Sequence, residues 1–209
     1  MESFFAGIRQ QWPAGRADYH WHVLLDPEPV RAQLTLPYRK LVHRAGLAPV
    51  LAVWTHITIE RLAPAAEVSD EERAQITALV RHDCAALAPF YLTIRRAEVW
   101  RNGVVCPVSP EQSLHQLWRI TTAASRQVTD GRFGTGAALA HPHLALAYAV
   151  DHLDDTPFQA WLSDHDVPEV RLRVSHVSLV AQRHDGRNIT WQLTQAIPLG
   201  VKSEHEHAL

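Results

Sequence analysis

The chain of 209 residues has only two cysteines, Cys84 and Cys106, and only two lysines, Lys40 and Lys202. Two cysteines are too few for a disulfide scaffold or for a zinc site built on cysteine. No apolar run approaches the roughly 20 residues that a membrane-spanning helix requires. Residues 1–5 are acidic and only briefly apolar, unlike a signal peptide. We therefore expect a soluble protein of the cytoplasm that does not engage a membrane.

The chain also lacks an excess of positive charge. Its 20 lysines and arginines are set against 22 aspartates and glutamates, for a formal net charge of −2. Proteins that bind duplex DNA along its backbone normally carry a clear surplus of Lys and Arg. The composition therefore argues against duplex DNA as a partner. A small phosphate ligand or an RNA end needs only one or two local cations, so both stay compatible with the sequence.

Hydrophobic residues make up 46% of the chain, enough to bury a full core. Alternating and helical apolar patterns predict strands at 20–25, 53–62, 90–99, 104–108, 143–150, 170–182 and 189–198, and helices at 29–43, 69–87, 109–130 and 155–162. Residues 1–16 are expected to form a lead-in segment without an element, and residues 201–209 a loose tail. Glycines between 131 and 136 predict a connector. Mixed helices and hairpins favour an α+β fold with antiparallel pairing.

The most informative pattern is His56-Ile57-Thr58, set in an alternating run. On a strand, residues i and i+2 share a face, so the imidazole and the hydroxyl are predicted to point into one space. An imidazole can transfer a proton near neutral pH, and a hydroxyl can donate to a phosphoryl oxygen. One such tripeptide also arises by chance, and a half-buried polar strand face explains it equally well.

Two later histidines offer a partner for His56. One is His143, in the run Pro142-His143-Leu144-Ala145-Leu146-Ala147-Tyr148, and the other is His176, in His176-Val177-Ser178. With either partner, one imidazole would act as the base on the attacking oxygen of a phosphoryl group and the other as the acid on the leaving oxygen. The pattern at His176 contains a hydroxyl that the pattern at His143 lacks.

These segments, with the stretch 174–199, resemble the 2H phosphoesterase superfamily, also described as 2′-5′ RNA ligase-like or cyclic phosphodiesterase proteins. The resemblance extends from His20 to Leu199. It implies one bilobal domain over residues 1–209, with two antiparallel-sheet lobes, helices on the outside and a central cleft that holds two His-x-Thr/Ser motifs. It also implies opening or formation of 2′,3′-cyclic or 2′-5′ phosphodiester linkages without metal or cofactor. The expected partner is a small nucleotide or an RNA 3′ end, and the expected state is a monomer.

The resemblance also favours His143 over His176. The family's second motif typically follows a proline and precedes Leu-Ala and a large polar residue, as Pro142, Leu146, Ala147 and Tyr148 do here. A helix and two strands should follow that motif, and only His143 leaves room for them. We therefore predict that His56 and His143 are the catalytic pair and that His176 lies outside the chemistry.

The predicted substrate contacts surround these two motifs. Thr58 is expected to hold the phosphate, with Tyr148 and the backbone of Ala145 as further contacts. Trp54 and Tyr148 could stack on a nucleobase, although packing between lobes explains them as well. Because Ala145 has no hydroxyl, a nucleotide- or RNA-end-binding protein with little catalysis is the alternative interpretation.

Two other residues stand near the motifs. His22 shares a strand face with His20, where it could border the cleft or form half of a metal site. We favour the cleft over a metal and predict no metal site, but simple packing of the two rings explains the pattern as well as either function does. A histidine-rich metal protein is a third possibility for the function. Arg61 falls on the face opposite His56 by strand parity, which argues against its serving as a phosphate clamp.

Overall fold

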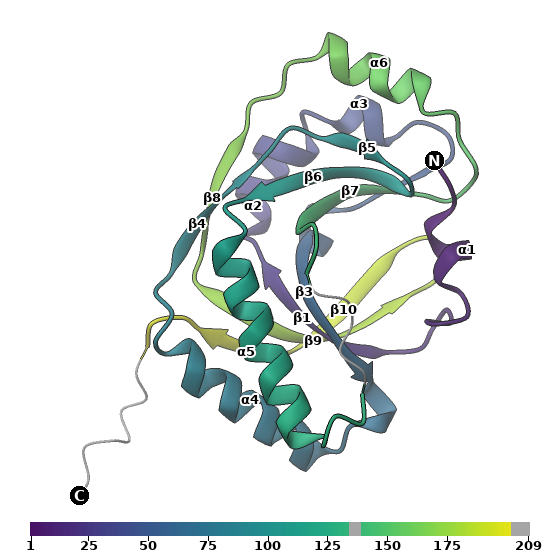
Figure 1. The fold of residues 1–209 in the computed structure, drawn as a ribbon. Coiled ribbons are helices and arrows are strands. Elements are labelled where there is room, and N and C mark those ends of the chain that lie inside the picture. Colours follow the sequence, from purple (N-terminus) through teal and green to yellow (C-terminus); the bar gives the residue numbers. More distant parts are fainter. Residues whose placement is uncertain (134–138, 202–209) are drawn as a thin grey trace, which may run out of the picture.

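The computed structural model describes residues 1–133 and 139–201 (Figure 1). Its helices are α1 (Phe4–Ile8), α2 (Pro27–Val30), α3 (Arg39–Val42), α4 (Asp70–Cys84), α5 (Gln112–Val128) and α6 (Thr156–Asp164). Its strands are β1 (Asp18–Leu24), β2 (Leu47–Pro49), β3 (His56–Pro64), β4 (Phe90–Ile94), β5 (Glu98–Trp100), β6 (Gly103–Ser109), β7 (His143–Ala149), β8 (Val170–Val174), β9 (His176–His184) and β10 (Ile189–Pro198). The described helices include none that is long and apolar enough to cross a membrane.

The described strands form one curled antiparallel sheet in the order β10-β9-β1-β3-β7-β6-β4-β8, with β2 added to β7 and β5 added to β6. Figure 1 shows two lobes, one around β1, β3, β9 and β10 and the other around β5, β6 and β7. The lobes are joined where β3 meets β7, through the antiparallel pair of Ile57 and Leu144. The predicted α+β, bilobal fold is confirmed.

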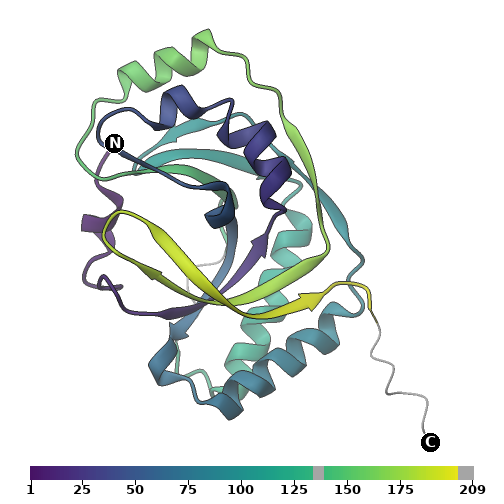
Figure 2. The ribbon, with the colours of Figure 1, turned by 180° about the vertical axis from the view of Figure 1, so that it is seen from behind.

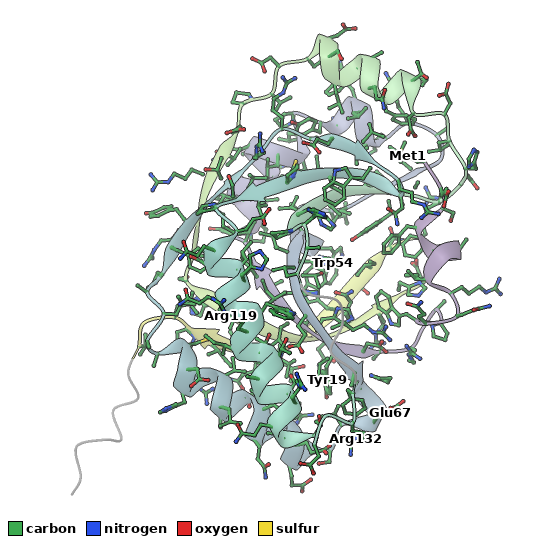
Figure 3. The ribbon with its side chains drawn as sticks, in the orientation of Figure 1. Met1, Tyr19, Trp54, Glu67, Arg119 and Arg132 are labelled. Atoms are coloured by element: carbon green, nitrogen blue, oxygen red, sulfur yellow. The ribbon has the colours of Figure 1, made fainter. Side chains whose placement is uncertain are left out.

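The helices lie outside the curled sheet. Helices α4 and α5 run side by side at one end of the molecule, and α2, α3 and α6 gather at the other end (Figure 2). Helix α4 begins with the predicted capping box, in which Ser69 Oγ accepts from the Glu72 amide and the Glu72 carboxylate accepts from the Ser69 amide. Such a cap stabilises a helix by about 1 kcal/mol. Arg132 lies beside Glu67 (Figure 3) and donates to its carbonyl at 3.1 Å.

The core is apolar and continuous between the sheet and its helices. Trp21, Ile57, Leu92 and Leu144 are fully buried within it. Burying each such side chain contributes about 1.5–3 kcal/mol. A smaller apolar cluster lies between the lobes and comprises Phe5, Trp12, Val105, Ala145, Tyr148 and Ile189. Its members come from the N-terminal segment and from both lobes, so this cluster ties the segment to the sheet.

Several expected elements have other boundaries in the structure. Residues 1–16 were expected to lack an element, and this is wrong, because α1 forms there and Phe5 is buried. The helix predicted over 29–43 is divided into α2, a π-helical turn and α3, with the non-helical Tyr38 just after Pro37. The strand predicted over 53–62 starts at His56, after a 3-10 turn at Ala52–Trp54. The tail from 202 and most of the Gly-rich connector, 134–138, lie outside the described residues.

Candidate active site

A cavity of about 260 Å³ lies where the two histidine-bearing strands meet. Strand β3 contributes His56, Thr58 and Arg61, and β7 contributes His143, Ala145 and Tyr148. The remaining lining residues are Phe4, Ile8, Gln11, Trp12, His20, Gln182 and Ile189. Both predicted catalytic histidines therefore face one cavity.

The register of β3 and β7 explains why the two motifs share a face. Ile57 pairs with Leu144 in antiparallel fashion. Neighbours of a paired residue point to the opposite side of the sheet from it. Continuing the register, His56 lies across from Ala145 and Thr58 lies across from His143. The two histidines are thus diagonal neighbours on the cavity side.

The two imidazole rings are held by the same kind of hydrogen bond. Nδ1 of His56 lies 3.0 Å from the carbonyl oxygen of Trp54, and Nδ1 of His143 lies 2.8 Å from that of His141. Because a carbonyl oxygen only accepts, Nδ1 must be the donor in each ring. In the neutral ring Nε2 then carries the lone pair, which is the atom needed for proton transfer.

The surroundings of His56 favour its neutral form. His56 is 7% exposed, and its ring stacks on His22 at 4.2 Å between centroids and makes a T-shaped contact with Trp191 at 4.8 Å. Burial lowers the pKa of His56 to about 4, against the opposing effect of the Trp54 carbonyl. Burial also lowers the pKa of His143, whose ring lies closer to solvent.

Arg61 lines the cavity, contrary to the prediction from strand parity. The pairing of β3 with β1 is irregular: His22 pairs with Thr58 and Trp21 with Glu60, so one residue of β3 is extra between them. Such a bulge changes which side of the sheet the following residues face. No sequence signal marks the bulge, since Ile59 suits a regular strand equally well.

The charge of Arg61 is only partly balanced. Its Nε donates to Asp18 Oδ2 at 2.9 Å, and Arg16 Nε donates to Asp18 Oδ1 at 2.8 Å. The Asp18 side chain is fully buried between the two guanidinium groups. One carboxylate against two cations leaves a net positive charge beside the cavity, which favours an anionic ligand.

The other predicted contact residues are distributed around the cavity. Thr58, Ala145 and Tyr148 line it, whereas Trp54 lines a neighbouring cavity of about 280 Å³ that shares Tyr148. His22 is fully buried behind His56, so its ring supports that histidine and does not line the cavity. Burial lowers the pKa of His22 well below its usual value.

His176 lies elsewhere, at the start of β9. It is exposed, pairs with Pro198 of β10, and places Nδ1 2.9 Å from Ser175 Oγ. The structure therefore brings His143, and not His176, to the cavity that holds His56. Among the described residues, no group of three or more His, Cys, Asp or Glu side chains is arranged to hold a metal ion.

Sequence reasoning missed the wall formed by the N-terminal segment. Phe4, Ile8 and Trp12 all line the cavity. Their spacing of four residues is a helical signal, but the run is too short to stand out from its polar neighbours. Gln182 and Ile189, from the β9–β10 hairpin, were also missed.

Comparison with known proteins places this geometry in a family. The model of the 2′-5′ RNA ligase superfamily matches residues 27–186. Among solved structures, TT0787 of Thermus thermophilus superposes with a TM-score of 0.66 at 20% identity, covering 89% of this chain and 100% of that one. E. coli LigT complexed with 3′-AMP superposes with a TM-score of 0.63 at 18% identity, covering 88% and 99%. E. coli LigT complexed with NADP+ gives 0.64 at 18% identity, with the same coverage.

The solved structures establish the fold, and the family model establishes the membership. No curated protein sequence matches the chain significantly. The family match, in contrast, spans more than half of the chain and contains both histidine motifs. The chain therefore belongs to the 2′-5′ RNA ligase superfamily, the 2H phosphoesterases.

Proposed function

We propose that the protein is a phosphodiesterase that uses His56 and His143 as an acid/base pair, without a metal, on 2′,3′-cyclic phosphates or 2′-5′-linked nucleotides. One observation carries this proposal. Two imidazoles from adjacent strands face one cavity, and each has its Nδ1 bonded to the carbonyl two residues earlier. Both rings are therefore oriented with Nε2 free for proton transfer.

His56 is the base in the proposed hydrolysis. Its buried ring is neutral at pH 7, because burial lowers its pKa to about 4. Nε2 of His56 takes a proton from water while the water oxygen forms a bond to phosphorus. The ester P–O bond of the cyclic phosphate breaks, and Nε2–H of His143 gives its proton to the leaving sugar oxygen. The products are a phosphomonoester and a free hydroxyl.

His143 is the acid because it is the less buried ring of the pair. A bound phosphoryl anion raises the pKa of both imidazoles, since a nearby negative charge favours the protonated form. The ring nearer to solvent has the smaller desolvation cost for that proton. The bound substrate anion thus favours the protonated form of His143, which is the acid that the cleavage of the substrate requires.

The phosphate is held by Thr58 and by the positive charge of Arg61, with the backbone at Ala145 as a further contact. Ala145 supplies no hydroxyl, and the loss of one charge-assisted hydrogen bond costs about 1.5–3 kcal/mol. If that bond forms only in the transition state, turnover falls about ten- to hundredfold. Arg61 offers partial compensation from β3.

A nucleotide is the proposed substrate class. Three solved structures of E. coli LigT contain 3′-AMP, NADP+ and ATP. In the present chain, aromatic side chains line the same cavity as the two histidines, among them Phe4 and Tyr148. An RNA 3′ end that terminates in a cyclic phosphate presents the same chemical group. We propose that the protein acts as a monomer of one bilobal domain.

A second candidate function follows from Ala145. A protein with this cavity and one hydroxyl fewer would bind the end of a nucleotide while turning it over slowly. It would bind 3′-AMP measurably and release no product from a cyclic nucleotide over long incubation.

The deciding experiment is hydrolysis of 2′,3′-cyclic AMP in excess EDTA by the wild type, His143→Ala and His176→Ala. His176 is the matched control, because it is an exposed histidine away from the cavity. We expect His143→Ala to lose turnover and His176→Ala to retain it. Loss only in His176→Ala would contradict the assignment of the pair. A wild type that binds 3′-AMP without hydrolysing the cyclic nucleotide would favour the second candidate function.

A further inference from the structure

The N-terminal segment, residues 1–16, spans the space between the lobes; we call it the strap. At one end the Glu2 amide donates to the Arg101 carbonyl at 2.6 Å, and the Glu2 carboxylate pairs with the Arg101 guanidinium at 2.7 Å. At the other end the Gly15 amide donates to the His184 carbonyl at 2.8 Å. Figure 1 shows α1 beside the gap between β5–β7 above and β9–β10 below, and Figure 3 shows Met1 at the upper lobe.

The strap has an anchoring side and a side that faces the cavity. Phe5 is 6% exposed and packs on Tyr148 and His184, with ring centroids at 5.6 and 5.2 Å. Phe4 and Ile8 are four residues apart, so they lie on one face of α1, and both are partly exposed where they line the cavity. Phe4 also packs on Tyr148 and Phe5, with ring centroids at 4.7 and 5.1 Å, but Phe4 and Ile8 keep part of their apolar surface exposed, unlike the buried Phe5.

The cavity has two chemically different sets of lining residues. The polar set suits a phosphoryl group and includes His56, Thr58, Arg61 and His143. The strap contributes no charged side chain to the lining, only Phe4, Ile8, Gln11 and Trp12. Its wall therefore suits an uncharged, planar group attached to the phosphate, and a nucleobase has that character.

We propose that Phe4 and Ile8 form a nucleobase-binding wall, which makes the strap a specificity element for nucleoside cyclic phosphates over cyclic phosphates without a base. This inference rests on the proposed function. Base stacking on aromatic side chains supplies affinity with little sequence preference, because every base has a flat face. The strap precedes residue 27, where the family match begins, so the wall comes from outside the matched region.

The test compares two substrates in three variants. The substrates are 2′,3′-cyclic AMP and ribose 2′,3′-cyclic phosphate, which differ in the base alone. We expect Phe4→Ala and Ile8→Ala to raise KM for the nucleotide about tenfold, with kcat and the reaction of the base-free sugar nearly unchanged. A tenfold change corresponds to about 1.4 kcal/mol. Arg9→Ala is the control, because Arg9 is exposed on the same segment and does not line the cavity.

Three results would overturn the proposal. Equal losses with both substrates would mean that the strap only supports the fold, and unchanged kinetics with both would mean that the base binds elsewhere. A lower KM in Phe4→Ala would mean that the strap covers the site. If the wild type hydrolyses neither substrate, the proposed function fails on its own. Binding of 3′-AMP and of ribose 3-phosphate to the same variants then decides the wall: a tenfold loss for 3′-AMP alone supports it, and equal effects refute it.

Discussion

Ile57 of β3 pairs with Leu144 of β7, and this contact between two buried residues sets the geometry of the proposed catalytic pair, His56 and His143. It turns both histidine motifs to one face of the sheet and places each histidine across from the third position of the other motif. On the β3 side that position is Thr58, and on the β7 side it is Ala145. The site is therefore nearly symmetric in its backbone and asymmetric in its phosphate contacts.

Restoring the hydroxyl at Ala145 should increase activity. We expect Ala145→Thr to raise kcat for 2′,3′-cyclic AMP about tenfold, because a hydroxyl bonded to the phosphoryl oxygens in the transition state is worth about 1.5 kcal/mol or more. Ala145→Val is the matched control, since it has the shape of threonine without the hydroxyl. Equal rates in the two variants would show that the phosphate does not approach this position. Steady-state kinetics at a fixed pH decides between them.

The pH dependence of kcat/KM should peak on the acidic side of neutrality. His56 acts as a base only when deprotonated, which holds above its pKa of about 4. His143 acts as an acid only when protonated, and burial lowers its pKa from 6.5. The rate should therefore already be falling as the pH rises past 6.5. We would measure kcat/KM across the range in which circular dichroism shows a folded protein, and an optimum above pH 7 would contradict the assigned roles.

Comparing Arg61→Ala with Arg16→Ala should distinguish an electrostatic contribution to catalysis from a contribution to stability, because both arginines pair with the same carboxylate. Arg61 and Arg16 both pair with the buried Asp18, but only Arg61 lines the cavity. We expect Arg61→Ala to lower kcat/KM for the cyclic nucleotide about ten- to hundredfold, the range for a lost charge-assisted contact. Arg16→Ala should keep most activity while losing comparable stability in urea unfolding. Similar activity losses in both variants would assign Arg61 a purely structural role.

The sequence predicted the main helices and strands, because apolar alternation and capping residues mark them locally. Alternation and capping located α4, β3, β7 and the C-terminal hairpin. The family resemblance of the residues around His143 predicted which later histidine shares a cavity with His56. The predicted position of Arg61 was wrong, because one extra residue in β3 moves Arg61 to the other side of the sheet. That extra residue alters neither the composition nor the apolar pattern of the strand. The sequence prediction also failed for the strap, because Phe4 and Ile8 gain their significance from segments about 140 residues away, which no local pattern encodes.

The buried histidines should make the fold sensitive to acid. Burial lowers the pKa of His20 to about 3, and neither of its ring nitrogens has a hydrogen-bond partner among the described residues. In the unfolded chain, His20 binds a proton near pH 6.5. The destabilising effect of burying its ring is therefore smallest above that pH, and the unfolding free energy decreases as the pH falls from 6.5 toward the folded pKa of about 3. We expect His20 alone to cost about 2 kcal/mol of unfolding free energy at pH 5. In urea unfolding, His20→Phe should lose that much less than the wild type between pH 7 and pH 5, whereas His82→Phe, on the exposed side of α4, should lose as much as the wild type.

Glu60 should have the opposite dependence on pH. Glu60 is 7% exposed, and its Oε2 has no hydrogen-bond partner among the described residues. Burial raises the pKa of Glu60 to about 7, against the effect of nearby hydroxyls on α5. The folded state therefore holds a proton that the unfolded chain releases above about pH 4.5, and the resulting destabilisation grows until about pH 7.

Replacing this carboxyl with an amide removes its ionisation and keeps its shape. We expect Glu60→Gln to raise the unfolding free energy at pH 8 by up to about 3 kcal/mol relative to wild type, and to leave it nearly unchanged at pH 4. Glu71→Gln, at an exposed position of α4, is the control and should change stability little at either pH. Glu60 lies two residues after Thr58, so the same variant also tests whether the carboxylate takes part in the proposed reaction. A gain in stability at pH 8 with unchanged hydrolysis of 2′,3′-cyclic AMP would show that the ionised carboxylate destabilises the fold and does not contribute to catalysis. A variant that is less stable at pH 8 than the wild type would show that the ionised carboxylate is well solvated or paired in the folded protein.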